Sequence, residues 1–316
     1  MSLKKKLLVT GANGFLGSRL VGCLDQNSIF ELTCAVRRAP VKTQGPEVVV
    51  KDLDADTHWD DALLGQDVVI HLAARAHVTR DEVHEPLAEY RRVNVEGTLR
   101  LARQAAEAGA ARFIFISSIG VNGNTNTRPF VKEDASKPVE PYAQSKHEAE
   151  QGLWKIGQET EMEIVIIRPP LVYGPNAPGN FGSLVRWAQK GLPLPLGSIH
   201  NKRSLVALDN LVDLIITCVD HPGAANETFL VSDGEDLSTT QLLQGVAEAM
   251  GKPSRLIPVP VGLLQFGATL LGKKAVAQRL LGSLQVDISH TQKCLNWTPP
   301  LTVKQGLQRC FPNRQD

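Results

Sequence analysis

Three glycines spaced three residues apart, Gly11, Gly14 and Gly17, lie between a short apolar run at 6–10 and a helical segment at 18–24. This order constrains the fold strongly, because glycines let the backbone turn sharply and approach a pyrophosphate at the start of a helix. An ordinary glycine-rich turn is the alternative. The expected cofactor-binding residues of this turn are Gly11, Asn13, Gly14, Phe15, Leu16 and Gly17.

The second predicted strand, at 32–36, ends in Arg37 and Arg38. Arg37 stands twenty residues after Gly17, where a carboxylate would bind the ribose 2′-hydroxyl of NAD. A guanidinium instead pairs well with a 2′-phosphate. We therefore expect NADP(H) as the preferred cofactor and NAD(H) as the alternative, unless the two arginines are merely exposed loop residues.

Further strands, alternating with helices, are predicted at 48–50, 68–72, 112–117 and 164–167. This alternation predicts an α/β fold with a Rossmann-type, doubly wound parallel sheet. A long helical stretch, interrupted near Pro86, is expected over 82–109, and Asn94 inside it needs either a buried hydrogen-bonding role or exposure to solvent. The cofactor site is expected to include, beyond the glycine turn, Asp52, Leu53, Ala73, Ala74, Arg75, Asn94 and Pro169.

After Gly174 prolines and glycines become frequent and the strand–helix alternation weakens. We therefore expect a smaller C-terminal substrate lobe, partly interleaved with the sheet domain through a strand around 229–231. The expected boundaries are 1–174, with returns near 205–232, for the NADP-binding Rossmann domain, and 175–204 with 233–316 for the lobe.

The composition excludes several classes of partner. A formal charge of +1 over 316 residues argues against nucleic acid. Five scattered cysteines without a Cys-x-x-Cys pair disfavour zinc and disulfides and indicate a reducing cytoplasm. The longest apolar stretch, 259–271, is shorter than the ~18 residues of a membrane span, so no membrane partner is expected. His71 and His77 are expected to be packed or on the surface, and no metal site is expected.

Tyr142 and Lys146 stand four residues apart in a segment that begins with Pro141 and has helical character. Both side chains therefore leave one face of the helix. A neighbouring ammonium favours the phenolate, so the pair predicts a tyrosine with its pKa shifted from ~10 toward neutrality. The same spacing also occurs on ordinary solvated helix faces.

The motif Thr10-Gly11-x-x-Gly14-x-x-Gly17, with Asn94, Ser118 and Tyr142-x-x-x-Lys146 following in that order, resembles the extended short-chain dehydrogenase/reductase family. The resemblance covers nearly the whole chain. It implies that Tyr142 is the acid/base, that Lys146 binds the nicotinamide ribose and lowers the pKa of Tyr142, and that Ser118 holds the substrate oxygen. Ser117 is the neighbouring alternative to Ser118.

Residues 118–120 narrow the expected reaction. Sugar dehydratases of this family have Thr-Asp-Glu there, whereas this chain has Ser118-Ile119-Gly120. Dehydration is therefore not expected, and 4-epimerisation or keto-sugar reduction remains. Arg37 favours reduction, because an epimerase retains an oxidised cofactor and typically has an acid at that position.

Segments including 121–123, 168–175 and 283–287 are similar to bacterial UDP-4-keto-6-deoxy-N-acetylhexosamine 4-reductases. We therefore expect an NADPH-dependent 4-keto reductase of a UDP-sugar, with a UDP-hexose 4-epimerase carrying tightly bound NAD as the alternative. A non-catalytic dinucleotide sensor is a remote third reading. The family implies substrate contacts from Asn180 and Phe181 to UDP and sugar, from Leu194 and Leu196 to uracil, and from Arg203 and Arg279 to the diphosphate.

Apolar helices near Leu99 and Leu153 admit two interpretations. By resemblance they would form a four-helix homodimer interface. They would equally fit the core of one chain.

Overall fold

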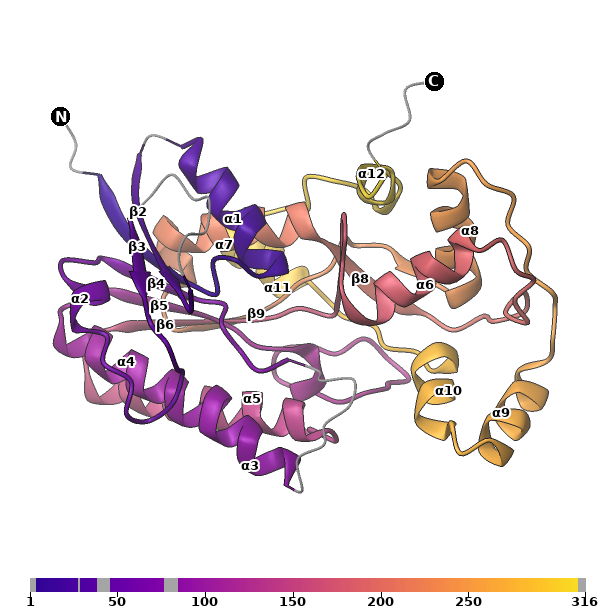
Figure 1. The fold of residues 1–316 in the computed structure, drawn as a ribbon, viewed down its shortest axis with the longest axis horizontal. Coiled ribbons are helices and arrows are strands. Elements are labelled where there is room, and N and C mark those ends of the chain that lie inside the picture. Colours follow the sequence, from indigo (N-terminus) through magenta and orange to yellow (C-terminus); the bar gives the residue numbers. More distant parts are fainter. Residues whose placement is uncertain (1–3, 28, 39–45, 77–84, 312–316) are drawn as a thin grey trace.

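The computed structural model describes residues 4–27, 29–38, 46–76 and 85–311. In this part of the chain a seven-stranded sheet has the order β3-β2-β1-β4-β5-β6-β9, and every neighbouring pair is parallel (Figure 1). The α/β prediction is therefore confirmed. The strands are β1 (Lys5–Thr10), β2 (Phe30–Val36), β3 (Glu47–Val49), β4 (Val68–His71), β5 (Arg112–Ile116), β6 (Glu163–Arg168) and β9 (Glu227–Leu230).

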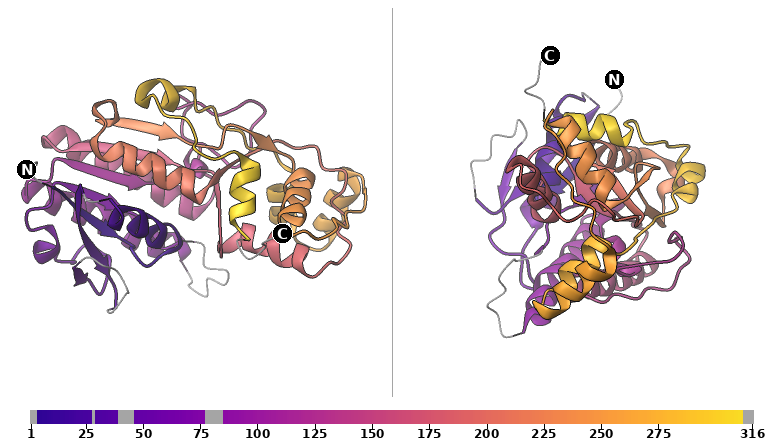
Figure 2. Two further views of the ribbon diagram at one scale, coloured as in Figure 1. Left: turned by 90° about the horizontal axis from the view of Figure 1, so that it is seen from above. Right: turned by 90° about the vertical axis from the view of Figure 1, so that its right-hand side faces the viewer.

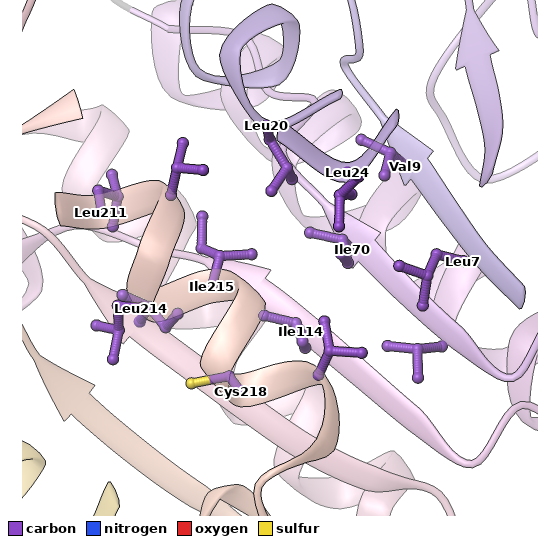
Figure 3. Close-up of a cluster of buried hydrophobic side chains, with 14 of the residues drawn as sticks. Leu7, Val9, Leu20, Leu24, Ile70, Ile114, Leu211, Leu214, Ile215 and Cys218 are labelled. Atoms are coloured by element: carbon purple, nitrogen blue, oxygen red, sulfur yellow. The ribbon is translucent and has the colours of Figure 1, made fainter. Parts of the chain in front are cut away.

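Helices cover both faces of this sheet because its strands are apolar on both sides. Leu7 and Val9 of β1 face a core shared with α1 (Phe15–Asp25) and α7 (Leu208–Asp220), as Figure 3 shows. Leu8 points the other way, toward a core shared with α4 (Gly97–Glu107) and α5 (Pro141–Glu159). Two short helices, α2 (Asp60–Leu63) and α3 (Pro86–Arg91), lie on the same side as α4 (Figures 1 and 2).

The smaller lobe is built on a three-stranded sheet in the order β10-β8-β7, within the described residues. Its core also holds side chains of several helices, most of them in the lobe. Its elements are β7 (Leu171–Tyr173), β8 (Arg203–Ala207), β10 (Asp236–Leu237), α6 (Gly179–Gln189), α8 (Thr239–Ala249), α9 (Val261–Leu270), α10 (Lys274–Leu281) and α12 (Val303–Arg309).

The chain passes back and forth between the lobe and the main sheet. β9 returns to the main sheet beside β6, as expected from 229–231, and α11 (Ser289–Leu295) contacts β9. The buried carboxylate of Asp233 joins the two parts, because it accepts hydrogen bonds from the Tyr173 hydroxyl at 2.7 Å and from Asn210 Nδ2 at 2.7 Å.

Of the helical stretch expected over 82–109, the described helix begins at Pro86, where the interruption was expected, and the stretch is divided once more farther along. After α3, residues Arg92–Glu96 form a π-helical turn, and α4 begins at Gly97. π-Helical turns often occur at functional sites, and here the turn contains Asn94. Residues 82–84 and His77 lie outside the described residues.

Leu153 belongs to the interior and Leu99 is half-buried against the same core, in agreement with the second interpretation. Leu153 is fully buried, and the two Cδ atoms of Leu99 lie so close to Gly152 that a Cβ there would meet them at 2.6 Å. These two side chains therefore hold α4 against α5. A homodimer through the outer faces of these helices stays a prediction.

The glycine turn predicts opposite effects of two alanine substitutions in α1. A Cβ on Gly17 would lie 2.0 Å from the carbonyl oxygen of Gly11, whereas nothing lies within 4 Å of a Cβ on Gly22. We expect Gly17→Ala to lower the free energy of unfolding by about 1–3 kcal/mol. Gly22→Ala, the matched control, should raise it by about 0.5–1 kcal/mol, because alanine is the better helix former. Urea unfolding measures both, and equal effects would contradict the predicted clash.

Candidate active site

The glycine turn lies at the carboxyl ends of β1 and β4, where the strand order of the sheet reverses. Ligands of open α/β sheets bind at such a position. Gly11 has a φ of +68°, and a Cβ on it would lie 2.8 Å from the backbone nitrogen of Ala73. Gly14 caps α1 with extended backbone and is exposed, as is Asn13, and the first turn of α1 holds no acidic residue. A close backbone cradle at an open helix start fits the pyrophosphate of a dinucleotide.

The segment after β4 is fixed by Asn94. Its Oδ1 accepts from the backbone nitrogen of Arg75 at 2.8 Å, and its Nδ2 donates to the carbonyl of Arg75 at 3.0 Å and to Ser145 Oγ at 3.1 Å. Asn94 is 1% exposed, so the structure favours the buried role over the solvated one. Its amide connects the strand-end segment 73–75 to α5.

A second polar group beneath the turn is one that sequence reasoning did not use. His71 is fully buried, and its ring nitrogens contact Thr10 Oγ1 at 2.7 Å and Thr98 Oγ1 at 3.0 Å. Burial, with the nearby Lys146, lowers the pKa of His71 to about 3, so the ring is neutral. Ala73 also donates its backbone N–H to Thr10. In the sequence, the feature that indicates this buried group is a histidine at the end of an apolar strand.

The other predicted cofactor residues lie at neighbouring strand ends. Arg37 and Arg38 are exposed directly after β2. Asp52 is exposed after β3, and Leu53 packs partly into the core. Pro169 is buried after β6, and its carbonyl accepts from Ile119 N at 3.0 Å.

Ser118, Tyr142 and Lys146 come together where β5 meets the start of α5. Lys146 Nζ donates to the Ile116 carbonyl at 2.8 Å and lies 6.0 Å from the centroid of the Tyr142 ring. Ser118 begins a 3₁₀ turn, Ile119–Val121, and its Oγ accepts from Gly120 N at 3.1 Å. A Cβ on Gly120 would lie 3.1 Å from that of Ala143, so this turn and α5 approach closely.

The electrostatics differ from the sequence expectation. Burial, and then the neighbouring Tyr90, raises the pKa of Tyr142 to about 12. Burial also lowers the pKa of Lys146 to about 7, although the Glu150 carboxylate opposes this shift. The predicted shift of Tyr142 toward neutrality is therefore wrong for the protein alone. Helix spacing indicates which side chains are neighbours, but not that Lys146 is buried and Tyr142 half-buried in surroundings that disfavour charge.

Tyr90 is a further residue of the site that the sequence did not predict. Its ring meets the Tyr142 ring edge-on, with the centroids 6.0 Å apart, and the guanidinium carbon of Arg75 lies 5.8 Å from the Tyr90 centroid. α3 thereby contributes one wall of the site. Nothing in the local sequence pattern indicated this contact, because 52 positions separate the two tyrosines and the break at Pro86 decides where α3 begins.

A buried ion pair lies directly behind the site. The carboxylate of Glu150, 1% exposed, accepts from Arg168 Nε at 2.9 Å and Nη2 at 2.5 Å and from Ser117 Oγ at 2.5 Å. Arg168 Nη1 donates to Asn122 Oδ1 at 3.0 Å. Because the Ser117 hydroxyl is engaged in the interior while Ser118 is half-buried, the geometry favours Ser118 as the substrate contact. In the sequence, the four-residue spacing of Tyr142, Lys146 and Glu150 is the feature that places Glu150 on the same helix face as the other two.

The predicted substrate residues are placed differently from one another. Asn180 is exposed at the start of α6, and Leu194 is half-buried. Phe181 is 1% exposed and packs against Tyr173, and Leu196 lies in the same core. The side chains of Phe181 and Leu196 therefore stabilise the lobe in this structure.

The two arginines predicted to bind the diphosphate both contact protein groups. Arg203 is half-buried, and its Nη1 donates to the Gly282 carbonyl at 3.0 Å. Arg279 Nη2 pairs with Glu140 Oε1 at 2.6 Å. A cavity of about 540 Å³ lies beside β8 and is lined by residues 199–202, Asp236 and residues of α8. None of the predicted substrate residues lines it. Among the described residues no group of three or more His, Cys, Asp or Glu side chains could hold a metal ion.

The buried amine predicts a pH dependence of stability. Lys146 binds a proton near pH 7 when folded but near 10.5 when unfolded, so between these values the unfolded state binds more protons and stability rises with pH. We compare the wild type with Lys146→Met by urea unfolding from about pH 6 to 8.5. The difference in unfolding free energy should be constant below pH 7 and should then change in favour of the wild type by up to about 1.4 kcal/mol per pH unit. A difference that stays constant throughout would contradict the lowered pKa.

The chain is similar to known proteins over most of its length. Residues 7–232 match the NAD dependent epimerase/dehydratase family. The chain is 48% identical to a UDP-glucose 4-epimerase of Vibrio cholerae over 97% of this chain and 94% of that one. It is 29% identical to an N-acetyl-alpha-D-glucosaminyl-diphospho-ditrans,octacis-undecaprenol 4-epimerase of Escherichia coli O157:H7, over 97% and 94%. The solved UDP-N-acetylglucosamine 4-epimerase of Bacillus cereus, 18% identical, has the same fold with a TM-score of 0.80 over 97% and 98%.

The relatives favour the epimerase alternative over the expected 4-keto reductase, and they do not confirm a preference for NADP. The enzyme class is nevertheless clear from the family, the relatives and the site together. The chain belongs to the NAD-dependent epimerase/dehydratase family and is an NAD(P)-dependent enzyme that acts on a nucleotide sugar.

Proposed function

We propose that the protein is a UDP-hexose 4-epimerase. The observation that carries this proposal is the 48% identity, over nearly the full length of both chains, to a relative named UDP-glucose 4-epimerase. The site is consistent with it, because Ile119 and Gly120 supply no acid or base beside Ser118 for the elimination of water. Tyr142 and Lys146 are both present, which argues against the non-catalytic sensor.

The residues of the site suit proton transfer at the 4-oxygen of a sugar. Ser118 Oγ would hold that oxygen, and the Tyr142 hydroxyl would exchange a proton with it. Lys146 would hold the ribose of the nicotinamide dinucleotide, which supplies the hydride exchange at carbon 4. With a pKa of about 12 the Tyr142 hydroxyl is protonated in the protein alone, so it is ready to donate. Acting as a base would require an added positive charge beside the ring.

A second candidate, NADPH-dependent reduction of a UDP-4-keto-6-deoxy-N-acetylhexosamine, is favoured by one feature. Arg37 and Arg38 are exposed at the end of β2, where a carboxylate would bind the ribose of NAD. A reductase consumes its cofactor with every turnover, whereas an epimerase returns it unchanged. Net cofactor use therefore separates the two proposals.

The first experiment incubates the purified protein and NAD with UDP-glucose, and in parallel NADPH with the UDP-4-keto sugar. We expect UDP-galactose, identified by NMR, without a net change in nicotinamide absorbance. Tyr142→Phe should lower the rate by about 10²-fold or more, since it removes the transferable proton, and should leave dinucleotide binding intact. Stoichiometric NADPH oxidation with the keto sugar and no epimerisation of UDP-hexoses would reject the epimerase in favour of the reductase.

The second experiment concerns the cofactor. If Arg37 binds a 2′-phosphate, Arg37→Asp should weaken NADP(H) binding by about tenfold or more, because a charge-assisted hydrogen bond is lost and a repulsion added. NAD(H) binding should change little. Lys190→Asp, at another exposed cation, is the control. Calorimetric titration measures all affinities, and an unchanged NADP(H) affinity in Arg37→Asp would remove the basis of the NADP prediction.

A further inference from the structure

Helix α9 has an apolar face that the rest of the described chain leaves uncovered. Leu263, Phe266 and Leu270 are 62%, 65% and 71% exposed, and Leu271 directly after the helix is 73% exposed. Figures 1 and 2 show α9 and α10 at the edge of the smaller lobe, away from the main sheet. Scattered apolar residues are common on surfaces, but four large ones within nine positions form a contiguous feature.

The exposed face is distinct from the face that anchors the helix. Leu263, Phe266 and Leu270 follow the i, i+3, i+7 spacing of one helical stripe. Val261 and Leu264 instead pack against the core of the lobe. α9 is therefore apolar on two sides, and folding of the described chain uses only one of them.

The sequence segment that contains the hairpin carries charged side chains of a single sign. From Ala249 to Val286 the sequence contains five Lys or Arg residues and no Asp or Glu, although cations and acids nearly balance over the whole chain, at 34 and 33. Lys273, in the turn between α9 and α10, and Lys274, the first residue of α10, are exposed shortly after Leu270 and Leu271. An exposed apolar stripe bordered by cations is complementary to a surface of acyl chains and anionic headgroups.

We propose that the α9–α10 hairpin docks the protein onto anionic lipid membranes, with Leu263, Phe266 and Leu270 entering the headgroup boundary and Lys273 and Lys274 contacting phosphate groups. Among the described helices none is long and apolar enough to cross a membrane, and α9 has ten residues. The helix therefore lies along the surface. The sequence expectation of no membrane partner considered only a span, and its length argument does not apply to a surface helix.

The hairpin is also joined to the active site. Arg279 of α10 pairs with Glu140, the N-cap residue of α5, and Tyr142 is the second residue of that helix. At its base, the carbonyl of Gly282 accepts hydrogen bonds from Arg203 and Asn201. A membrane-bound hairpin would thus hold the N-terminal end of α5 close to the lipid surface.

The test is flotation of the full-length protein with vesicles of pure phosphatidylcholine or of phosphatidylcholine with phosphatidylglycerol. We expect the wild type to float with the anionic vesicles and only weakly with the neutral ones. F266S/L270S removes the apolar contact and K273E/K274E reverses the charge, so each should weaken binding by about tenfold or more. Added salt should weaken it as well.

Two matched controls test the location of the contact. Leu64→Ser changes an apolar residue that is 82% exposed outside the hairpin, and Lys304→Glu reverses an exposed cation of α12, so both should bind vesicles as the wild type does. Circular dichroism and NAD binding show that each variant is folded. The proposal is overturned if the wild type fails to float with anionic vesicles, if neutral vesicles bind it equally well, or if the hairpin variants still bind. Loss of dimer mass in F266S/L270S without vesicle binding by the wild type would assign the face to a second copy instead.

Discussion

The site depends on keeping the amine of Lys146 in an interior where it is 2% exposed. A buried amine needs a hydrogen-bond acceptor and favourable charges, or it loses its proton. The Ile116 carbonyl accepts from it at 2.8 Å, the centroid of the Phe115 ring lies 4.3 Å away, and Glu150 raises its pKa against the effect of burial. The result is an amine that titrates near neutrality.

Glu150 connects this amine to the rest of the site. Its carboxylate binds Arg168 at the end of β6 and Ser117 at the end of β5, while its own helix carries Lys146 and Tyr142. Removing one partner of a buried ion pair costs about 3–5 kcal/mol, so these elements are strongly held in place. Since Ser118 follows Ser117 directly, the pair behind the site also positions the hydroxyl in front of it.

The predicted cofactor side is held by a close backbone approach and by the side chain of Asn94. Gly11 brings the first turn within contact distance of Ala73, and Asn94 holds Arg75 to α5 through Ser145. The π-helical turn that contains Asn94 explains why a weak helix former stands inside a helical segment. The predicted cofactor turn and the predicted acid/base pair are thus parts of one hydrogen-bonded arrangement.

Patterns within one element were predictable from the sequence. The glycine turn, the parallel strands and the shared face of Tyr142 and Lys146 all follow from periodicity or spacing. The direction of the Tyr142 pKa did not, because spacing carries no information on desolvation. The pairing of Glu150 with Arg168, of Arg279 with Glu140 and of Tyr90 with Tyr142 joins elements that only the tertiary fold brings together. Phe181 and Leu196 show the same limit, because their burial in the lobe core depends on helices far along the chain.

The central claim is the proposed 4-epimerase activity, in which carbon 4 of a nucleotide sugar is inverted and receives the same hydrogen back. Mass spectrometry of the isolated UDP-galactose tests this most directly, after reaction of UDP-glucose deuterated at carbon 4 with NAD as the cofactor and a smaller amount of unlabelled NADH in solution. The account predicts UDP-galactose that retains the deuterium, because the hydrogen leaves and returns within one bound complex. UDP-galactose in which carbon 4 carries hydrogen from the solvent or from added NADH, or no UDP-galactose at all, would contradict it.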